Sequence, residues 1–240
     1  NSCKNAWCRD SFPFISFQLT FMKCPRCVQK IHPGATSCPH CGFAMEHADE
    51  VFGTEDIKLK KFSDVAGVFR MKDREPMRKV LEDFESKFPQ LFVAIYLGAF
   101  DDLNSLRQYG FWMLNRTHYV DVESQRPNAT GILILVDVNA KRASITYGYA
   151  LMPYLDERST FSALSAGHPL FLQGDYPGAL KAVVQKLESI LIKGWGGVRK
   201  APIEVLAKGG QTLKQVGTEQ ETARDLESPD GTGTIGEAEG

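Results

Sequence analysis

The sequence lacks any apolar run of about 18 residues, which is the length that a membrane-spanning helix needs. It also lacks a dominant charge, because 28 Lys and Arg residues are balanced by 29 Asp and Glu residues, for a net charge of −1. The basic residues at 58–61 and 199–200 are too sparse to form a nucleic-acid-binding face. These absences argue against a membrane span and predict no nucleic-acid partner.

What the chain does have is enough apolar material for one α/β core with small appendages, with 43% hydrophobic residues in 240. Residues 132–138 form a continuous apolar run, which predicts a strand buried on both faces. Residues 139–141 offer turn chemistry, and residues 142–149 alternate polar and apolar positions. We therefore expect a hairpin at the centre of a sheet, with Asp137 paired, for example with Arg142 across the turn.

Helical and strand patterns flank this hairpin on both sides. The pattern predicts a helix over 73–88 with Asp73 as its cap, a buried strand over 91–100 and a helix over 103–119. Two further helices are expected over 155–165 and 175–192, a short edge strand over 57–62 and a linker over 46–54. This order predicts an α/β fold with a mixed central β-sheet and helices on both faces.

Four cysteines carry the most specific local signal. Cys24 and Cys27 are two residues apart, ten residues follow, and Cys38 and Cys41 repeat the spacing. Such paired knuckles place four thiolates around one tetrahedral ion, so we expect a small structural zinc ribbon over residues 22–45. His40 could compete as a ligand, although four cysteines are available. Free thiolates favour a reducing compartment, and we expect a cytoplasmic location.

The ends of the chain differ in composition from its middle. Residues 1–21 precede Met22 without a starting Met, and we interpret them as a non-native leader rather than a secretory signal, because Pro13 and several polar residues interrupt their apolar run. Cys3 and Cys8 lie in this segment and receive no role. Residues 55–200 form the main domain. Residues 208–240 are polar and acidic, which predicts a disordered tail.

From about residue 62 to residue 191 the chain resembles the TPM domain family, which includes a thylakoid-lumen acid phosphatase and a photosystem II repair protein. The matching features, in chain order, are Asp64-Val65-Ala66-Gly67, the buried strand running into Asp101, Gly131 to Val136, Tyr147-Gly148-Tyr149, and Phe171 to Tyr176. The resemblance implies a central sheet between helices. For some members it also implies binding of Ca²⁺ or Mg²⁺ and hydrolysis of phosphomonoesters.

The chain departs from the family pattern at several acidic positions. Ala129-Thr130-Gly131 stands where the family usually has Asp-Asn-Gly, and Thr146 and Met152 stand at two further acidic positions. The remaining candidates for binding a cation are Asp64, Asp101, Asp102 and Asp156. Each of them can equally be read as a helix cap or a loop carboxylate.

Two functions remain in view. The first is a protein-interaction or scaffold module with structural zinc, because the acidic set is depleted and a closed four-cysteine site leaves no position open for catalysis. The alternative is a divalent-cation-dependent acid phosphatase acting on a phosphorylated substrate. Nucleic-acid binding through the ribbon ranks last, since the motif carries only Lys23, Arg26 and Lys30 as basic residues.

Overall fold

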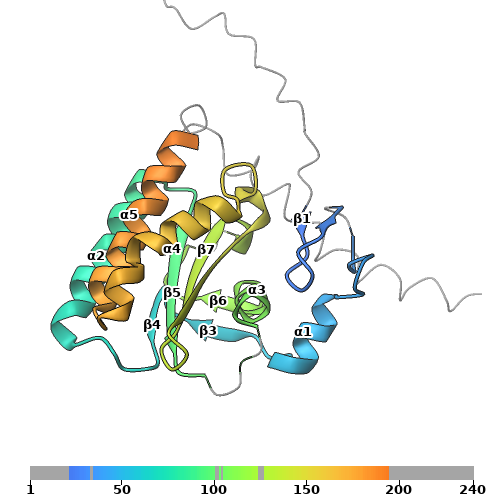
Figure 1. The fold of residues 1–240 in the computed structure, drawn as a ribbon, viewed down its shortest axis with the longest axis horizontal. Helices are drawn as coiled ribbons and strands as arrows, with labels where there is room; N and C mark the ends of the chain where they lie inside the picture. Colours follow the sequence, from blue (N-terminus) through green and yellow to red (C-terminus); the bar gives the residue numbers. More distant parts are fainter. Residues whose placement is uncertain (1–21, 33–34, 101–102, 104, 124–126, 195–240) are drawn as a thin grey trace, which may run out of the picture.

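The computed structural model describes residues 22–32, 35–100, 103, 105–123 and 127–194. The expected leader, the acidic tail, Asp101 and Asp102 lie outside these residues. Figure 1 shows a sheet with helices on either side and, beside it, a small N-terminal module made of the described residues between 22 and 52. In chain order the elements are β1 (Met22–Lys23), β2 (Lys30–Ile31), α1 (Met45–Phe52), β3 (Ile57–Leu59), β4 (Phe62–Asp64), α2 (Met71–Lys87), β5 (Phe92–Gly98), α3 (Leu106–Arg116), β6 (Thr117–Tyr119), η1 (Asn128–Thr130), β7 (Gly131–Asp137), β8 (Arg142–Tyr147), η2 (Tyr149–Leu151), α4 (Glu157–Leu172) and α5 (Tyr176–Gly194).

The main sheet has the strand order β4-β5-β7-β8. The first three strands are parallel, and β7 pairs antiparallel with β8 from Ile132 opposite Tyr147 to Asp137 opposite Arg142. Every residue of β7 is buried, which confirms the strand predicted from its continuous apolar run. The hairpin is confirmed too, but its predicted central place holds only for β7, because β8 is an edge strand.

Helices cover both faces of this sheet, as predicted. On one face α2, α4 and α5 pack over the β5 and β7 side chains that include Ile95, Leu97 and Ile134. The opposite face, which includes Phe92 and Leu133, packs against α3 and the N-terminal module. The alternation follows from the strand period of two, since neighbouring residues of an all-apolar strand supply opposite cores.

Several predicted boundaries were wrong. The segment expected to be one edge strand over 57–62 is divided, because β3 pairs with β6 in a separate two-stranded sheet and Phe62 starts β4 in the main sheet. The expected 103–119 helix ends at Arg116, where β6 begins. Helix α2 begins two residues before Asp73, so Asp73 lies in its first turn and does not cap it. Helix α4 extends through Pro169 to Leu172.

The segment expected to be a linker over 46–54 forms helix α1. Its one buried charged residue, Asp49, accepts hydrogen bonds from Trp112 Nε1 at 3.1 Å and from Arg116 Nε at 2.9 Å, and a second Arg116 nitrogen binds its other oxygen. Trp112 Nε1 also donates to the carbonyl of Gly53. These bonds fasten α1 to α3. In the described part of the chain, no helix is both long and apolar enough to cross a bilayer.

We predict that Asp49→Asn lowers the free energy of unfolding by about 2 kcal/mol at neutral pH, because the amide cannot accept from both Arg116 nitrogens. Hydrogen bonding to Arg116 lowers the pKa of Asp49. The stabilisation is therefore present above the unfolded pKa of about 3.9 and is lost as the pH falls through the folded value. Thermal unfolding followed by circular dichroism across this range measures the difference.

The matched control is Glu50→Gln, since Glu50 is the exposed neighbour on the same helix. It should leave the melting temperature unchanged at both ends of the pH range. An Asp49→Asn deficit that persists undiminished in strong acid would contradict the role of the ion pair.

Candidate metal centre

The two cysteine pairs sit in backbone turns of the same kind. In the first, Val28 N–H donates to the carbonyl of Cys24 at 2.9 Å, and Cys24 N–H donates to the carbonyl of Gln29 at 3.0 Å. In the second, Gly42 N–H donates to the carbonyl of Cys38 at 2.8 Å, and Cys38 N–H donates to the carbonyl of Phe43, also at 2.8 Å. The repeated sequence spacing therefore folds into two equivalent knuckles.

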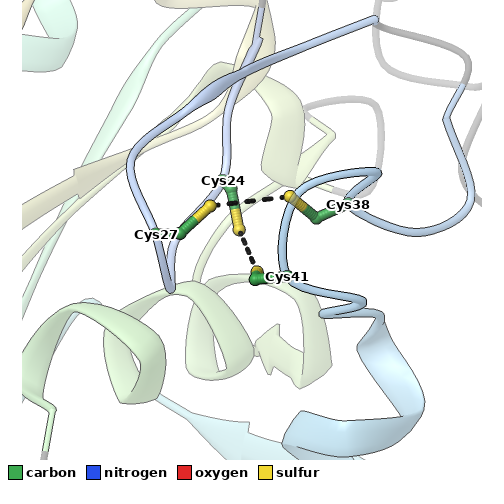
Figure 2. A group of neighbouring side chains, drawn as sticks. All are labelled: Cys24, Cys27, Cys38 and Cys41. Atoms are coloured by element: carbon green, nitrogen blue, oxygen red, sulfur yellow. Dashed lines mark hydrogen bonds between the residues drawn. The ribbon is translucent and has the colours of Figure 1, made fainter.

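The knuckles bring all four sulfur atoms together, as Figure 2 shows. The Sγ atoms of Cys24 and Cys41 are 3.7 Å apart, and those of Cys27 and Cys38 are 3.6 Å apart. All four lie within 4.8 Å of one another, and none is in a disulfide. Such a cluster can hold one metal ion.

The pKa values of Cys24 and Cys38 are shifted in opposite directions. Burial raises the pKa of Cys24 to about 12. Burial also acts on Cys38, but backbone hydrogen bonds from His40 and Cys41 outweigh it and lower the pKa to about 6. A metal ion must displace the remaining protons, so its affinity for this cluster falls as the pH is lowered.

The cluster is built into the core on one face of the sheet. Cys24 and Cys38 are buried in the same hydrophobic cluster as Phe43, Trp112 and Leu133. A row of aromatic rings connects the parts, since Phe43 of the second knuckle meets Phe111 of α3 at 6.0 Å and Phe111 meets Tyr149 at 6.4 Å. Burial raises the pKa of Tyr149, and the nearby charge of Cys24 raises it further. The metal centre is therefore continuous with the α/β domain.

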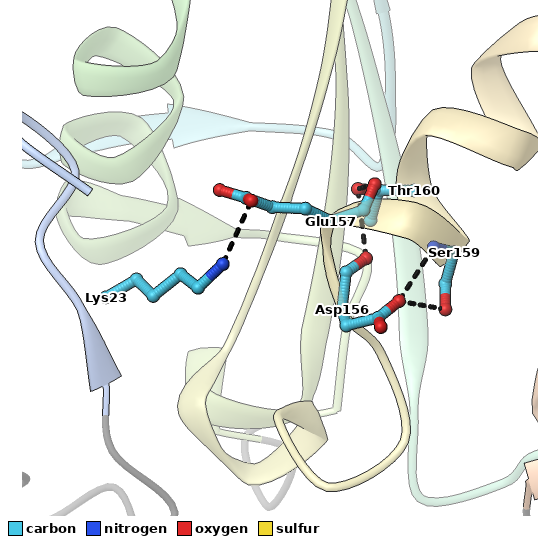
Figure 3. A network of polar contacts seen from close by, with 5 residues as sticks. All are labelled: Lys23, Asp156, Glu157, Ser159 and Thr160. Atoms are coloured by element: carbon cyan, nitrogen blue, oxygen red, sulfur yellow. Dashed lines mark hydrogen bonds and ion pairs between the residues drawn. The ribbon is translucent and has the colours of Figure 1, made fainter. Parts of the chain in front are cut away.

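A salt bridge makes a second connection between the knuckles and the domain. Lys23 Nζ lies 2.9 Å from Glu157 Oε2, at the start of α4 (Figure 3). Both side chains are largely exposed, so this ion pair contributes little by itself. The neighbouring Asp156 caps α4 by accepting a hydrogen bond from Ser159 N–H at 2.7 Å, and hydrogen bonds from Ser159 lower its pKa. Its carboxylate is thus already engaged at a helix N-terminus.

Of the two acidic candidates that the structure describes, Asp64 and Asp156, Asp64 is the better buried, and its side chain has no exposed surface. Its oxygens accept hydrogen bonds from the N–H groups of Val68 and Phe69, and Arg74 pairs with it at 3.1 Å. The carboxylate closes the loop between β4 and α2. A cation at Asp64 would have to compete with these three donors.

Asp137 ends β7 at the same edge of the sheet as Asp64. It pairs with Arg142 at 3.1 Å, as predicted, and it also accepts from Ala140 N–H. Among the residues that the structure describes, the four cysteines form the one group of three or more His, Cys, Asp or Glu side chains close enough to share an ion. Asp64 and Asp156 are not brought into such a group, and Asp101 and Asp102 lie outside the described residues.

Sequence reasoning missed helix α1, which packs in the same hydrophobic cluster as the cysteines. The signal was present in residues 45–52, where Met45, Ala48, Asp49 and Phe52 have helical spacing and share one face. Asp49 on that face is a charged residue, which made the segment resemble a linker. Its partners, the buried Trp112 and the partly exposed Arg116, are more than 60 residues away in the sequence.

Comparison with known proteins identifies the family of the α/β domain. The family model described as TPM domain matches residues 62–190, which is more than half of the chain, so the chain belongs to the TPM domain family. The comparison with curated proteins gives no match.

Solved structures give weaker likenesses. The N-terminal domain of a Corynebacterium glutamicum protein has 13% identity and a TM-score of 0.43, over 54% of this chain and 78% of its own. The N-terminal domain of a P. gingivalis protein has 17% identity and a TM-score of 0.43, over 63% and 92%. A protein from the psychrophilic bacterium Bizionia argentinensis has 14% identity and a TM-score of 0.45, over 54% and 85%.

The knuckles provide an internal test of backbone strain. Val28 and Gly42 occupy equivalent positions with left-handed φ values of 64° and 70°. A Cβ atom at Gly42 would have no neighbour within 4 Å, so a side chain there costs only conformational energy. We predict that Gly42→Val lowers the free energy of unfolding by about 1–2 kcal/mol, the cost of a left-handed non-glycine residue.

The reciprocal variant, Val28→Gly, should relieve the same strain and leave the melting temperature unchanged or higher. Calorimetric melting temperatures of the two variants and the wild type provide the comparison. Equal melting temperatures for Gly42→Val and the wild type would show that the turn carries no such strain.

Proposed function

We propose that this protein is a cytoplasmic protein-interaction or scaffold module whose four cysteines hold a structural zinc ion. The observation that carries the proposal is the closed sulfur cluster built into the hydrophobic core that the knuckles share with the sheet. A four-thiolate site has no open coordination position for water, so its contribution is to stability and shape. The function then resides in the surfaces that the metal holds in place.

The sulfur geometry supports zinc as the ion. Zn–S bonds of about 2.3 Å in a tetrahedron place neighbouring sulfur atoms about 3.8 Å apart. The two short sulfur distances of 3.6 and 3.7 Å are close to this value. Four soft thiolates also favour zinc over the hard cations Ca²⁺ and Mg²⁺.

The exposed tips of the knuckles are the part of this module most suited to a protein partner. Arg26 in the first knuckle and Pro39 and His40 in the second are exposed, while the cysteines beside them face inward. A rigid turn presents such side chains at little entropic cost. We expect an unidentified protein partner to contact these tips.

The alternative function is a divalent-cation-dependent phosphatase, which membership of the TPM domain family supports. It would use Asp64, Asp101, Asp102 and Asp156 with Ca²⁺ or Mg²⁺. The hydrogen bonds to Asp64 from Val68, Phe69 and Arg74 count against it, because the carboxylate is already neutralised by an arginine. The capping role of Asp156 counts against it in the same way.

We predict that the purified protein contains one zinc ion per chain, as measured by native mass spectrometry and elemental analysis. Removing the ion with a chelator, or making Cys38→Ser, should lower the free energy of unfolding by about 4 kcal/mol, the stabilisation expected from a ligand present at roughly 1,000 times its Kd. Ser37→Ala is the matched control beside the ligand. Full stability of the metal-free protein would contradict a structural role.

Affinity capture from the native cells, with the full chain as bait, tests the interaction surface. We expect Arg26→Glu combined with His40→Glu to lose a partner that the wild type and the exposed control Lys181→Glu both retain, with zinc content unchanged.

Hydrolysis of a generic phosphomonoester by the wild type with added Ca²⁺ or Mg²⁺ should give no rate above that of the Asp64→Asn variant. A metal-dependent rate that Asp64→Asn abolishes would favour the phosphatase instead.

A further inference from the structure

A cavity of about 420 Å³ lies between helix α4 and the β7–β8 hairpin, and its lining includes none of the four cysteines and neither Asp64 nor Asp156. Val136 and Ala143 line it from the sheet, and Phe161, Leu164 and Leu172 line it from α4. Its volume is in the range of small-molecule sites, and its lining is mainly apolar, as such sites require.

The hollow has a simple cause in the sequence of β8. The side chains of β8 that pack toward the α2, α4 and α5 layer are Tyr147, Ile145 and Ala143, in decreasing size toward the hairpin turn. Ala143 stands opposite Val136 in the register, so the last cross-strand pair on this face is the smallest. Helix α4 packs across β8, and the short side chain of Ala143 does not fill the space beneath the helix. The space beside Ala143 is therefore a consequence of the fold.

Helix α4 leaves large apolar side chains exposed at this cavity. Phe161 is 73% exposed and Leu172 is 60% exposed, and both line the hollow. Their spacing of eleven residues, with Ser165 and His168 between them, places them along one face of the helix. Exposed apolar side chains gathered at a concave site mark a place where a ligand is bound.

The charges at the cavity have one sign. Lys141 and Arg142 line it at the hairpin turn, His168 adds a ring nitrogen from α4, and among the lining side chains that the structure describes there is no carboxylate. Arg142 is paired with Asp137, whose side chain is fully buried, and its own side chain remains about half exposed. Lys141 is exposed beside it. The mouth of the cavity thus favours an anion, while its walls favour an apolar body.

Two aromatic rings also line the cavity and add apolar surface. Phe171 and Tyr176 meet edge to face, with ring centroids 6.1 Å apart, and both line the hollow. An aryl group or an alkyl chain can pack against such rings.

We propose that this groove binds an amphipathic monoanion, with an aryl or medium-chain alkyl body between α4 and the hairpin and a carboxylate or sulfonate head beside Lys141. Burial of the apolar body supplies most of the affinity, and the cationic turn selects the sign of the head group. The binding is independent of the zinc ion and of any phosphatase activity, because none of the residues involved belongs to either site.

The test uses the full-length, zinc-loaded protein and the fluorescent anion anilinonaphthalene sulfonate as probe. We expect saturable binding to the native state at one site per chain, and displacement by decanoate at about tenfold lower concentration than by decylammonium. Equal displacement by the two would overturn the selection for an anion. Displacement by poly-glutamate, or only by phosphatidylglycerol vesicles, would overturn the proposal that the ligand is a soluble amphipathic anion.

Variants locate the site. Ala143→Leu should fill the hollow and abolish probe binding without lowering the melting temperature, and Lys141→Glu should raise the Kd about fivefold. Matched controls are Val65→Ser, at another exposed apolar residue, and Lys79→Glu on α2, neither of which lines the cavity. If Ala143→Leu does not fold, Phe161→Ser replaces it as the cavity variant, since the Phe161 side chain is mostly exposed and its loss should not unfold the protein. Wild-type binding by the folded cavity variant would overturn the proposal.

Discussion

Burial of both faces of the central sheet is the constraint on which the rest of the structure depends. The strands β5 and β7 are apolar on both faces, so each face of the sheet must be covered. Three helices cover one face, but on the other α3 shares the task with the cysteine knuckles, whose Cys24, Cys38 and Phe43 enter the same cluster as Phe92 and Leu133. The cysteine cluster therefore forms part of the cover of the sheet.

Paired charges explain why the carboxyl edge of the parallel strands differs from an open cation site. Asp64 ends β4 and Asp137 ends β7, and neither side chain has exposed surface. A buried carboxylate without a partner is costly, and here Arg74 and Arg142 supply the partners. The same pairing that makes burial tolerable occupies the oxygens that a hard cation would need. At that edge, the two described carboxylates Asp64 and Asp137 thus take part in structural ion pairs.

The described residues present two different surfaces to solution. The knuckle tips are polar, turn-based and held by the sulfur cluster, which suits contact with a protein. The groove beside α4 is concave, apolar and cationic at its mouth, which suits a small amphipathic anion. Because the two surfaces use no residue in common, each can act while the other is empty.

The sequence by itself determined the features that depend on local pattern. The cysteine spacing predicted that four sulfur atoms come together, the all-apolar run predicted β7, and the order of elements predicted a mixed sheet with helices on both faces, because spacing and periodicity are local properties. Arg142 was named as one possible partner of Asp137 from its place across the turn, and the structure pairs the two. Only the tertiary structure decided that Asp49 pairs with Arg116 and that Asp64 pairs with Arg74. It also decided that β8 is an edge strand and that a groove lies beside Ala143. Each of these depends on partners distant in sequence, and such contacts decide which polar groups are satisfied and which hollows remain unfilled.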